Sequence, residues 1–93
     1  MQSLVDYQCE IFTLLNDDMW MASLAKEIGR NIKLQRVGLD ISQAELAFSA
    51  QLNQSYLSKI ENGAVNISVQ ILYNIAGAMN CDPHKLLPKI IDN

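Results

Sequence analysis

Residues 41–63 read ISQAELAFSAQLNQSYLSKIENG, and this stretch decides the fold. Its apolar residues recur at helical intervals, which predicts one short helix over residues 43–50 and a second over residues 54–62. Residues 51–53 form the connection between them. Two short helices joined by a tight turn are typical of a helix-turn-helix motif.

Small polar residues stand where these helices begin. Ser42 can cap the first helix, and Glu45, three residues later, completes a capping box. Asn53 can cap the second helix, while Ser68 and Asp82 can cap two later ones. The capping residues therefore predict where each helix starts.

Three more helices are predicted around the motif. The first covers residues 19–37 and is broken by Gly38 and Asp40, and the others cover residues 69–79 and 83–87. No segment alternates with a period of two, so we expect no strand. The side chains expected in the core are Leu24, Ile28, Ile32, Leu46, Ala47, Leu57, Ile60, Leu72, Ile75, Ala76 and Met79.

The first 18 residues differ from the rest of the chain. Apolar side chains recur there at helical spacing, which predicts an amphipathic leader helix; they are Leu4, Tyr7, Ile11, Phe12 and Leu15. Residues 1–20 hold four acids and no base, whereas residues 21–93 hold all seven Lys and Arg residues against six acids. We therefore expect an acidic leader, 1–18, followed by a mildly basic domain, 19–93.

Composition excludes several classes of protein. A chain of 93 residues with 49% apolar and 18% charged residues has room for one globular core. Its apolar runs are too short to span a membrane, and Lys26 is the first basic residue, so the positively charged start of a signal peptide is missing and we expect a cytoplasmic protein. Cys9 and Cys81 are read as free thiols, and the single histidine, His84, as a surface residue. No catalytic motif, metal site or cofactor site is predicted.

The motif resembles a known family. Ser42-Gln-Ala-Glu-Leu-Ala47, Tyr56-Leu-Ser-Lys-Ile-Glu-Asn-Gly63 and Leu72-Tyr-Asn-Ile-Ala76 together look like the Cro/C1-type, or xenobiotic-response-element, helix-turn-helix regulators. Residues 56–68 are most similar to the controller proteins of restriction–modification systems. The resemblance implies an all-α, five-helix, lambda-repressor-like domain, to which the leader would add an N-terminal amphipathic helix. It also implies a partner, double-stranded DNA, and no enzymatic activity.

The resemblance assigns DNA contacts to the helix at 54–62, which would enter the major groove. A helix fits that groove, and a Gln amide can bind adenine while a Lys ammonium can bind guanine. The implied base-contacting residues are Gln54, Ser55 and Lys59, and the residues implied to contact the DNA backbone or to lie beside a contact are Gln43, Tyr56, Ser58, Asn62 and Asn66.

Two further positions carry structural expectations from the same resemblance. Arg36 and Glu61 match positions that form a partly buried ion pair, so Arg36 is expected to stabilise the fold and not to bind phosphate. Gln51 stands where the family usually has Gly in the turn, so we expect a strained or distorted turn.

A single short helix reads only a few base pairs, and the resemblance implies that members of the family commonly bind DNA as twofold dimers. We therefore expect a homodimer. The candidate dimer residues fall in two groups: Ile71, Tyr73, Leu87, Ile90 and Ile91 near the C-terminus, and Phe12 and Leu15 in the leader. Two functions stay open: a sequence-specific transcription regulator, either a repressor or an autoregulating controller, and an antitoxin-like interaction module whose leader holds a protein partner.

Overall fold

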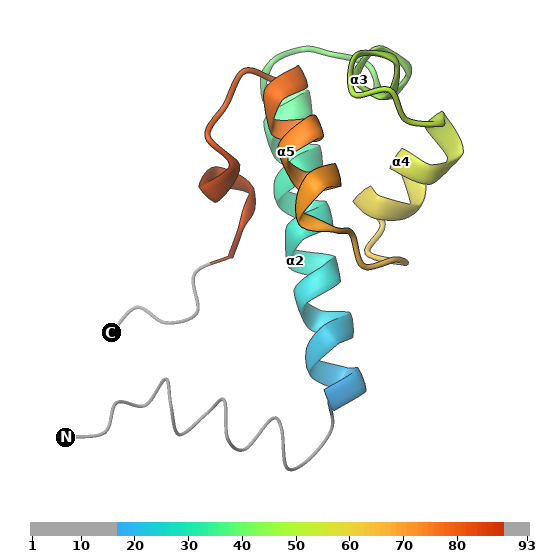
Figure 1. The fold of residues 1–93 in the computed structure, drawn as a ribbon, viewed down its shortest axis with the longest axis vertical. Coiled ribbons are helices and arrows are strands. Elements are labelled where there is room, and N and C mark those ends of the chain that lie inside the picture. Colours follow the sequence, from blue (N-terminus) through green and yellow to red (C-terminus); the bar gives the residue numbers. More distant parts are fainter. Residues whose placement is uncertain (1–16, 89–93) are drawn as a thin grey trace, which may run out of the picture.

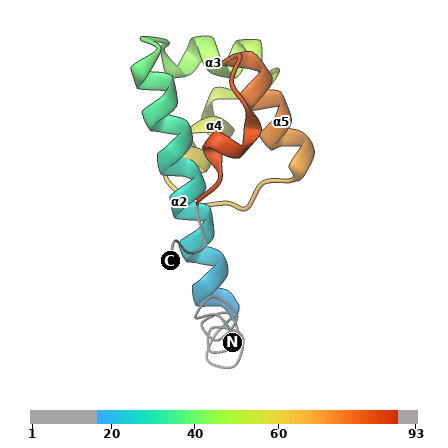
Figure 2. The ribbon, with the colours of Figure 1, turned by 90° about the vertical axis from the view of Figure 1, so that its left-hand side faces the viewer.

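The structure, a computed structural model, describes residues 17–88; the predicted leader helix, Ile90 and Ile91 lie outside them. Within this range the chain forms four α-helices and one 3-10 helix: α2 (Asp17–Gly38), α3 (Gln43–Ser49), α4 (Gln54–Glu61), α5 (Val69–Ala78) and η1 (Pro83–Leu86). The long helix α2 is the spine, and the shorter elements gather around its C-terminal half (Figure 1). Turned by 90°, α3 lies across the C-terminal end of α2 (Figure 2). The described part is therefore all-α, as predicted.

The core is shared by every element. Its largest fully buried side chains are Ile32 from α2, Leu46 from α3, Leu57 and Ile60 from α4, Ile75 from α5 and Leu86 from η1. The predicted core side chains of the three shorter α-helices are all buried, whereas Leu24 and Ile28 of α2 are half-buried. Because each element contributes to one apolar cluster, α4 is held in place by the whole domain.

Each α-helix is followed by a residue in the left-handed conformation. One residue with positive φ follows each helix: Asp40 (60°), Gln51 (60°), Gly63 (74°) and Asn80 (53°). In the turn after α3, the N–H of Leu52 donates to Ala47 O at 2.8 Å, and the N–H of Gln51 donates to Phe48 O at 3.1 Å. These are the two hydrogen bonds of a Schellman motif. Of the two residues expected to break α2, Asp40 makes the turn as predicted, whereas Gly38 is still the last helical residue.

The last element departs from the predicted fifth α-helix. Pro83–Leu86 forms a 3-10 helix of four residues, and Asp82 makes no side-chain cap hydrogen bond. Pro83 has no N–H to donate, and Pro88 prevents a second turn, so the segment is too short for an α-helix. The Asp82 Oδ1 atom instead lies 3.4 Å from His84 Nδ1.

Helices α2 and α4 meet closely at Gly29. A Cβ atom on Gly29 would lie 2.1 Å from the carbonyl oxygen of Ile60 and 2.9 Å from that of Glu61. No side chain fits in that space, so glycine is required for this approach. The close contact brings the end of α4 against α2 about two helical turns before Arg36.

Candidate nucleic-acid interface

Helix α4 has one buried and one exposed face. Asn53 caps its N-terminus, accepting a hydrogen bond from the N–H of Ser55 at 2.7 Å. Leu57 and Ile60 are buried, as predicted. The three predicted base-contacting residues, Gln54, Ser55 and Lys59, are all exposed, with half-buried Ser58 between them on the same face. Tyr56 is also half-buried, but it packs against the core.

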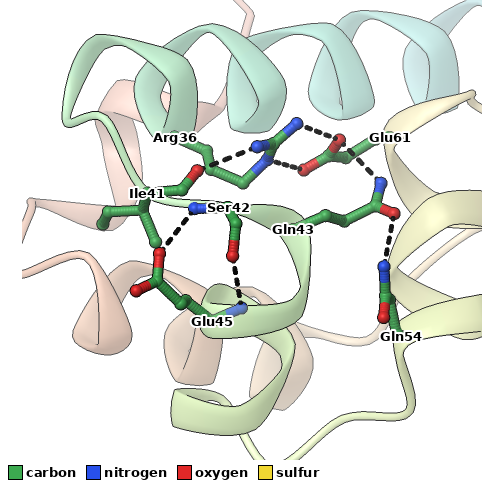
Figure 3. Close-up of polar contacts among 7 residues, drawn as sticks. All are labelled: Arg36, Ile41, Ser42, Gln43, Glu45, Gln54 and Glu61. Carbon is green, nitrogen blue, oxygen red and sulfur yellow. Dashed lines mark hydrogen bonds and ion pairs between the residues drawn. The ribbon is translucent and has the colours of Figure 1, made fainter.

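Arg36 of α2 and Glu61 at the end of α4, the expected partners, are in contact with each other (Figure 3). Arg36 Nε lies 2.7 Å from Glu61 Oε2 and Nη2 lies 3.1 Å from Oε1, which is a bidentate arrangement. Nη1 of the same guanidinium donates to the carbonyl of Ile41 at 2.9 Å. The side chains are 13% and 2% exposed, so this pair joins α2 to α4 inside the domain.

Gln43 connects this ion pair to the exposed face of α4. Its Nε2 atom donates to Glu61 Oε1 at 3.1 Å, and its Oε1 atom accepts from Gln54 Nε2 at 3.5 Å. Sequence reasoning missed both contacts, because Gln43 and Glu61 are 18 residues apart and meet only through the packing of α3 on α4. Asn62 and Asn66, the remaining residues predicted to contact the DNA backbone, follow α4 in the chain and are exposed.

The predicted capping box is present at the start of α3. The hydroxyl of Ser42 accepts from the N–H of Glu45 at 3.0 Å, and the N–H of Ser42 donates to Glu45 Oε1 at 2.8 Å. The second hydrogen bond lowers the pKa of the Glu45 carboxyl. The N-terminus of α3 therefore already carries the negative charge of Glu45, which repels phosphate. At this helix end the neutral amide of Gln43 is a better candidate for a phosphate contact than Glu45.

Large apolar side chains are also exposed on α5 and after η1. Val69 and Tyr73, one turn apart on α5, are 71% and 59% exposed, and Leu87 is also exposed. Sequence reasoning missed Val69, whose exposure depends on how α5 seats on the core. Ile71 is half-buried and packs against the core, so it contributes only part of its side chain to this surface. Phe12, Leu15, Ile90 and Ile91 lie outside the described residues.

The solvent-facing side of α3 carries Phe48, which is 86% exposed and which sequence reasoning also missed.

His84 is exposed, and burial raises the pKa of the half-buried Cys81 thiol. Among residues 17–88, no cluster of His, Cys, Asp and Glu side chains could hold a metal ion. None of the helices over the same residues is both long and apolar enough to cross a membrane.

Comparison with known proteins identifies helix-turn-helix relatives. Residues 32–86 match the sequence profile of a helix-turn-helix family. The control protein C.BamHI of Bacillus amyloliquefaciens is 36% identical over 58 residues, which are 62% of this chain and 69% of that protein.

Two solved structures superpose on most of the described residues. The restriction-modification controller protein C.AhdI of Aeromonas hydrophila gives a TM-score of 0.66 at 28% identity, over 68% of this chain and 96% of that one. The hypothetical transcription factor NHTF from Neisseria gives 0.66 at 31% identity, over 70% and 75%. The similarity covers the region in which α4 presents its polar face.

Proposed function

The chain belongs to the Cro/C1-type helix-turn-helix family of DNA-binding transcription regulators, which are not enzymes, and from this premise we propose that it binds a specific DNA sequence as a homodimer. In this proposal α4 enters the major groove and the protein acts as a repressor or autoregulating controller. The site of action would be the cytoplasm, where the DNA is.

One observation carries the proposal: the exposed face of α4 is polar from end to end, while its opposite face is buried in the core. An α-helix about 10 to 12 Å across fits a major groove about 12 Å wide. We assign base contacts to Gln54, Ser55 and Lys59. Gln54 can bind adenine at N6 and N7, and Lys59 can bind guanine at O6 and N7.

The neighbouring polar residues would fix the orientation of the domain on the duplex. We assign phosphate contacts to the amides of Gln43, Asn62 and Asn66, because contacts to phosphate position a protein without reading sequence. Ser58 lies on the same face of α4 as Lys59, and the partly buried Tyr56 flanks it.

A second copy would bind the apolar surface of α5 and the segment after η1. Val69, Tyr73 and Leu87 expose large apolar side chains there, and Ile90 and Ile91 continue the chain just beyond. A twofold dimer would place two α4 helices on half-sites about 34 Å apart. The recognition face of α4 carries a single base, Lys59, so two domains are needed for useful affinity.

The relatives support the controller role, because two of them are control or controller proteins by name. We further propose that the leader, expected over residues 1–18, is separate from the domain expected over 19–93; its last two residues, Asp17 and Asp18, open α2 and so belong to the domain. In the alternative function, an antitoxin-like module, this leader would hold a protein partner, and its apolar residues, Phe12 and Leu15 among them, favour that use.

Fluorescence anisotropy tests the proposal directly. The purified chain is titrated onto labelled DNA from upstream of its own gene and onto unrelated DNA, over a range of salt. We expect preferential, salt-sensitive binding whose concentration dependence requires two chains. Equal binding to both duplexes would contradict sequence-specific autoregulation and favour the interaction module.

A further inference from the structure

The carboxylate of Glu61 is shared between two neighbours. Oε2 accepts from Arg36 Nε at 2.7 Å, while Oε1 accepts from Arg36 Nη2 and from Gln43 Nε2, each at 3.1 Å. Gln43 in turn accepts, through its own Oε1, from Gln54 Nε2 at 3.5 Å. A continuous chain of hydrogen bonds therefore runs from α2 to the first residue of the exposed α4 face (Figure 3).

This chain has a direction, and Glu61 sets it. An ionised carboxylate only accepts hydrogen bonds, whereas an amide side chain donates through nitrogen and accepts through oxygen. Gln43 must therefore turn its nitrogen to Glu61, which leaves its oxygen to face Gln54. Gln54 must then donate through its nitrogen, so one orientation of its amide is favoured over the reversed one.

The carboxylate is also fixed well enough to impose this direction. Glu61 is 2% exposed in its side chain, and two hydrogen bonds from Arg36 hold it. Arg36 is itself fixed by its bond to the carbonyl of Ile41 at 2.9 Å. An exposed, freely rotating acid could not favour one amide orientation, but a buried, doubly bonded one can.

We infer that Glu61 is a positioning residue for base recognition, acting on Gln54 through Gln43. Adenine presents its N7 acceptor and N6 donor side by side, and a Gln amide satisfies both in only one orientation. In that favoured orientation Gln54 keeps one N–H and its oxygen free for the base. The inference rests on the proposed function, because it requires Gln54 to face DNA.

Two variants of the full-length chain separate this role from a structural one. Gln43→Met keeps the side-chain length and helix propensity but removes the amide that links Glu61 to Gln54. The double variant Arg36→Met/Glu61→Leu replaces the ion pair by apolar side chains, an exchange that is often neutral for stability. Melting temperatures by circular dichroism establish that each variant is folded, and Gln43→Met decides the matter if the double variant is not.

The measurement is base discrimination at one position. A random pool of duplexes selected with the wild-type chain gives its preferred site, and Gln54→Ala identifies the base pair that residue 54 reads. Wild type should discriminate there by about tenfold or more, as expected for a bidentate contact. We expect both variants to lose most of that ratio, while discrimination at the base pair read by Lys59 is unchanged.

Each other outcome overturns a different statement. If the folded variants bind every sequence more weakly by one common factor, Gln43 contacts only phosphate, Glu61 is only structural, and the inference fails. Wild-type discrimination in both variants would overturn it as well. A wild-type chain that enriches no sequence from the pool would instead contradict the proposed function itself.

Discussion

Helices α4 and α5 both bury one face in the same core, yet their exposed faces differ in chemistry. On α4 the exposed residues offer only amide, hydroxyl and ammonium groups, whereas α5 exposes the large apolar side chains of Val69 and Tyr73 beside the polar Gln70 and Asn74. Hydrogen-bonding groups suit a groove lined with donors and acceptors, and exposed apolar side chains suit another apolar surface. From this difference we propose two partners for one small domain: DNA at α4 and a second copy at α5.

The largest expected effect comes from removing the support behind α4. Arg36→Ala would leave the Glu61 carboxylate buried without its ionic partner, which costs about 3 to 5 kcal/mol. We expect this variant to be largely unfolded in urea titrations monitored by circular dichroism. Arg30→Ala removes the same charge from an exposed position of α2 and should change the free energy of unfolding little. Equal effects of the two substitutions would show that the ion pair contributes nothing specific.

Gly29→Ala tests the close contact between α2 and α4. The added methyl group would meet the Ile60 carbonyl oxygen, so we expect a loss of about 2 to 3 kcal/mol in unfolding free energy. Gly77→Ala in α5 is the matched control, since nothing lies within 4 Å of its Cβ position. That substitution should stabilise the helix by about 0.5 to 1 kcal/mol. Stabilisation by both would contradict a close contact between α2 and α4 at Gly29.

The Gly29 prediction concerns a contact between α2 and α4 that the sequence could not reveal. Ser42, Asn53 and Ser68 were predicted as caps, and each accepts the expected backbone N–H, because capping depends on neighbours within three residues. The buried residues of α4 follow from helical periodicity for the same local reason. The approach of α2 to α4 depends instead on how the two helices cross, and the crossing of whole helices cannot be predicted from a local pattern of residues.

The candidate site divides in the same way. Motif resemblance was sufficient to name the exposed residues of α4 and the partners Arg36 and Glu61. The hydrogen bonds of Gln43 require the relative positions of α3 and α4, and the 3-10 form of η1 depends on two prolines that restrict one short segment. Exposure of Val69 and Phe48 likewise depends on the packing of whole helices.

Tyr73→Glu should break the α5 side of the comparison. A buried carboxylate without a partner at the dimer surface would weaken association by about 2 kcal/mol or more. Sedimentation equilibrium should then report a monomer at concentrations where the wild-type chain is a dimer. Phe48→Glu introduces the same charge on α3, at a residue that is more exposed than Tyr73, and should leave the dimer intact. If Phe48→Glu disrupts the dimer and Tyr73→Glu does not, the dimer surface lies on α3.

On the α4 side, Lys59→Ala should lower specific DNA affinity by about 1 to 3 kcal/mol without unfolding the domain. Lys85→Ala is charge-matched and lies on η1, on the other side of α2 from α4 (Figure 1). Anisotropy titrations on the preferred site should show little change for this control. Equal losses would indicate general attraction to phosphate in place of base recognition.

The smallest expected effect concerns the turn between α3 and α4. Gln51 has a φ of 60°, which costs a residue with a side chain about 1 to 2 kcal/mol. Gln51→Gly removes this strain but adds entropy to the unfolded chain, so we expect a net gain of about 0.5 to 1 kcal/mol. Differential scanning calorimetry would detect it as a higher melting temperature, and a lower one would show that Gln51 makes a compensating contact.

Site-specific photo-crosslinking tests the division between the two faces most directly. Benzoylphenylalanine replaces either Ser55 on α4 or Tyr73 on α5, and each folded protein is irradiated with its preferred duplex. Position 55 should give a protein–DNA adduct, and position 73 a covalent dimer that forms with or without DNA. A DNA adduct from position 73, or none from position 55, would contradict the assignment of DNA to α4 and of a second copy to α5.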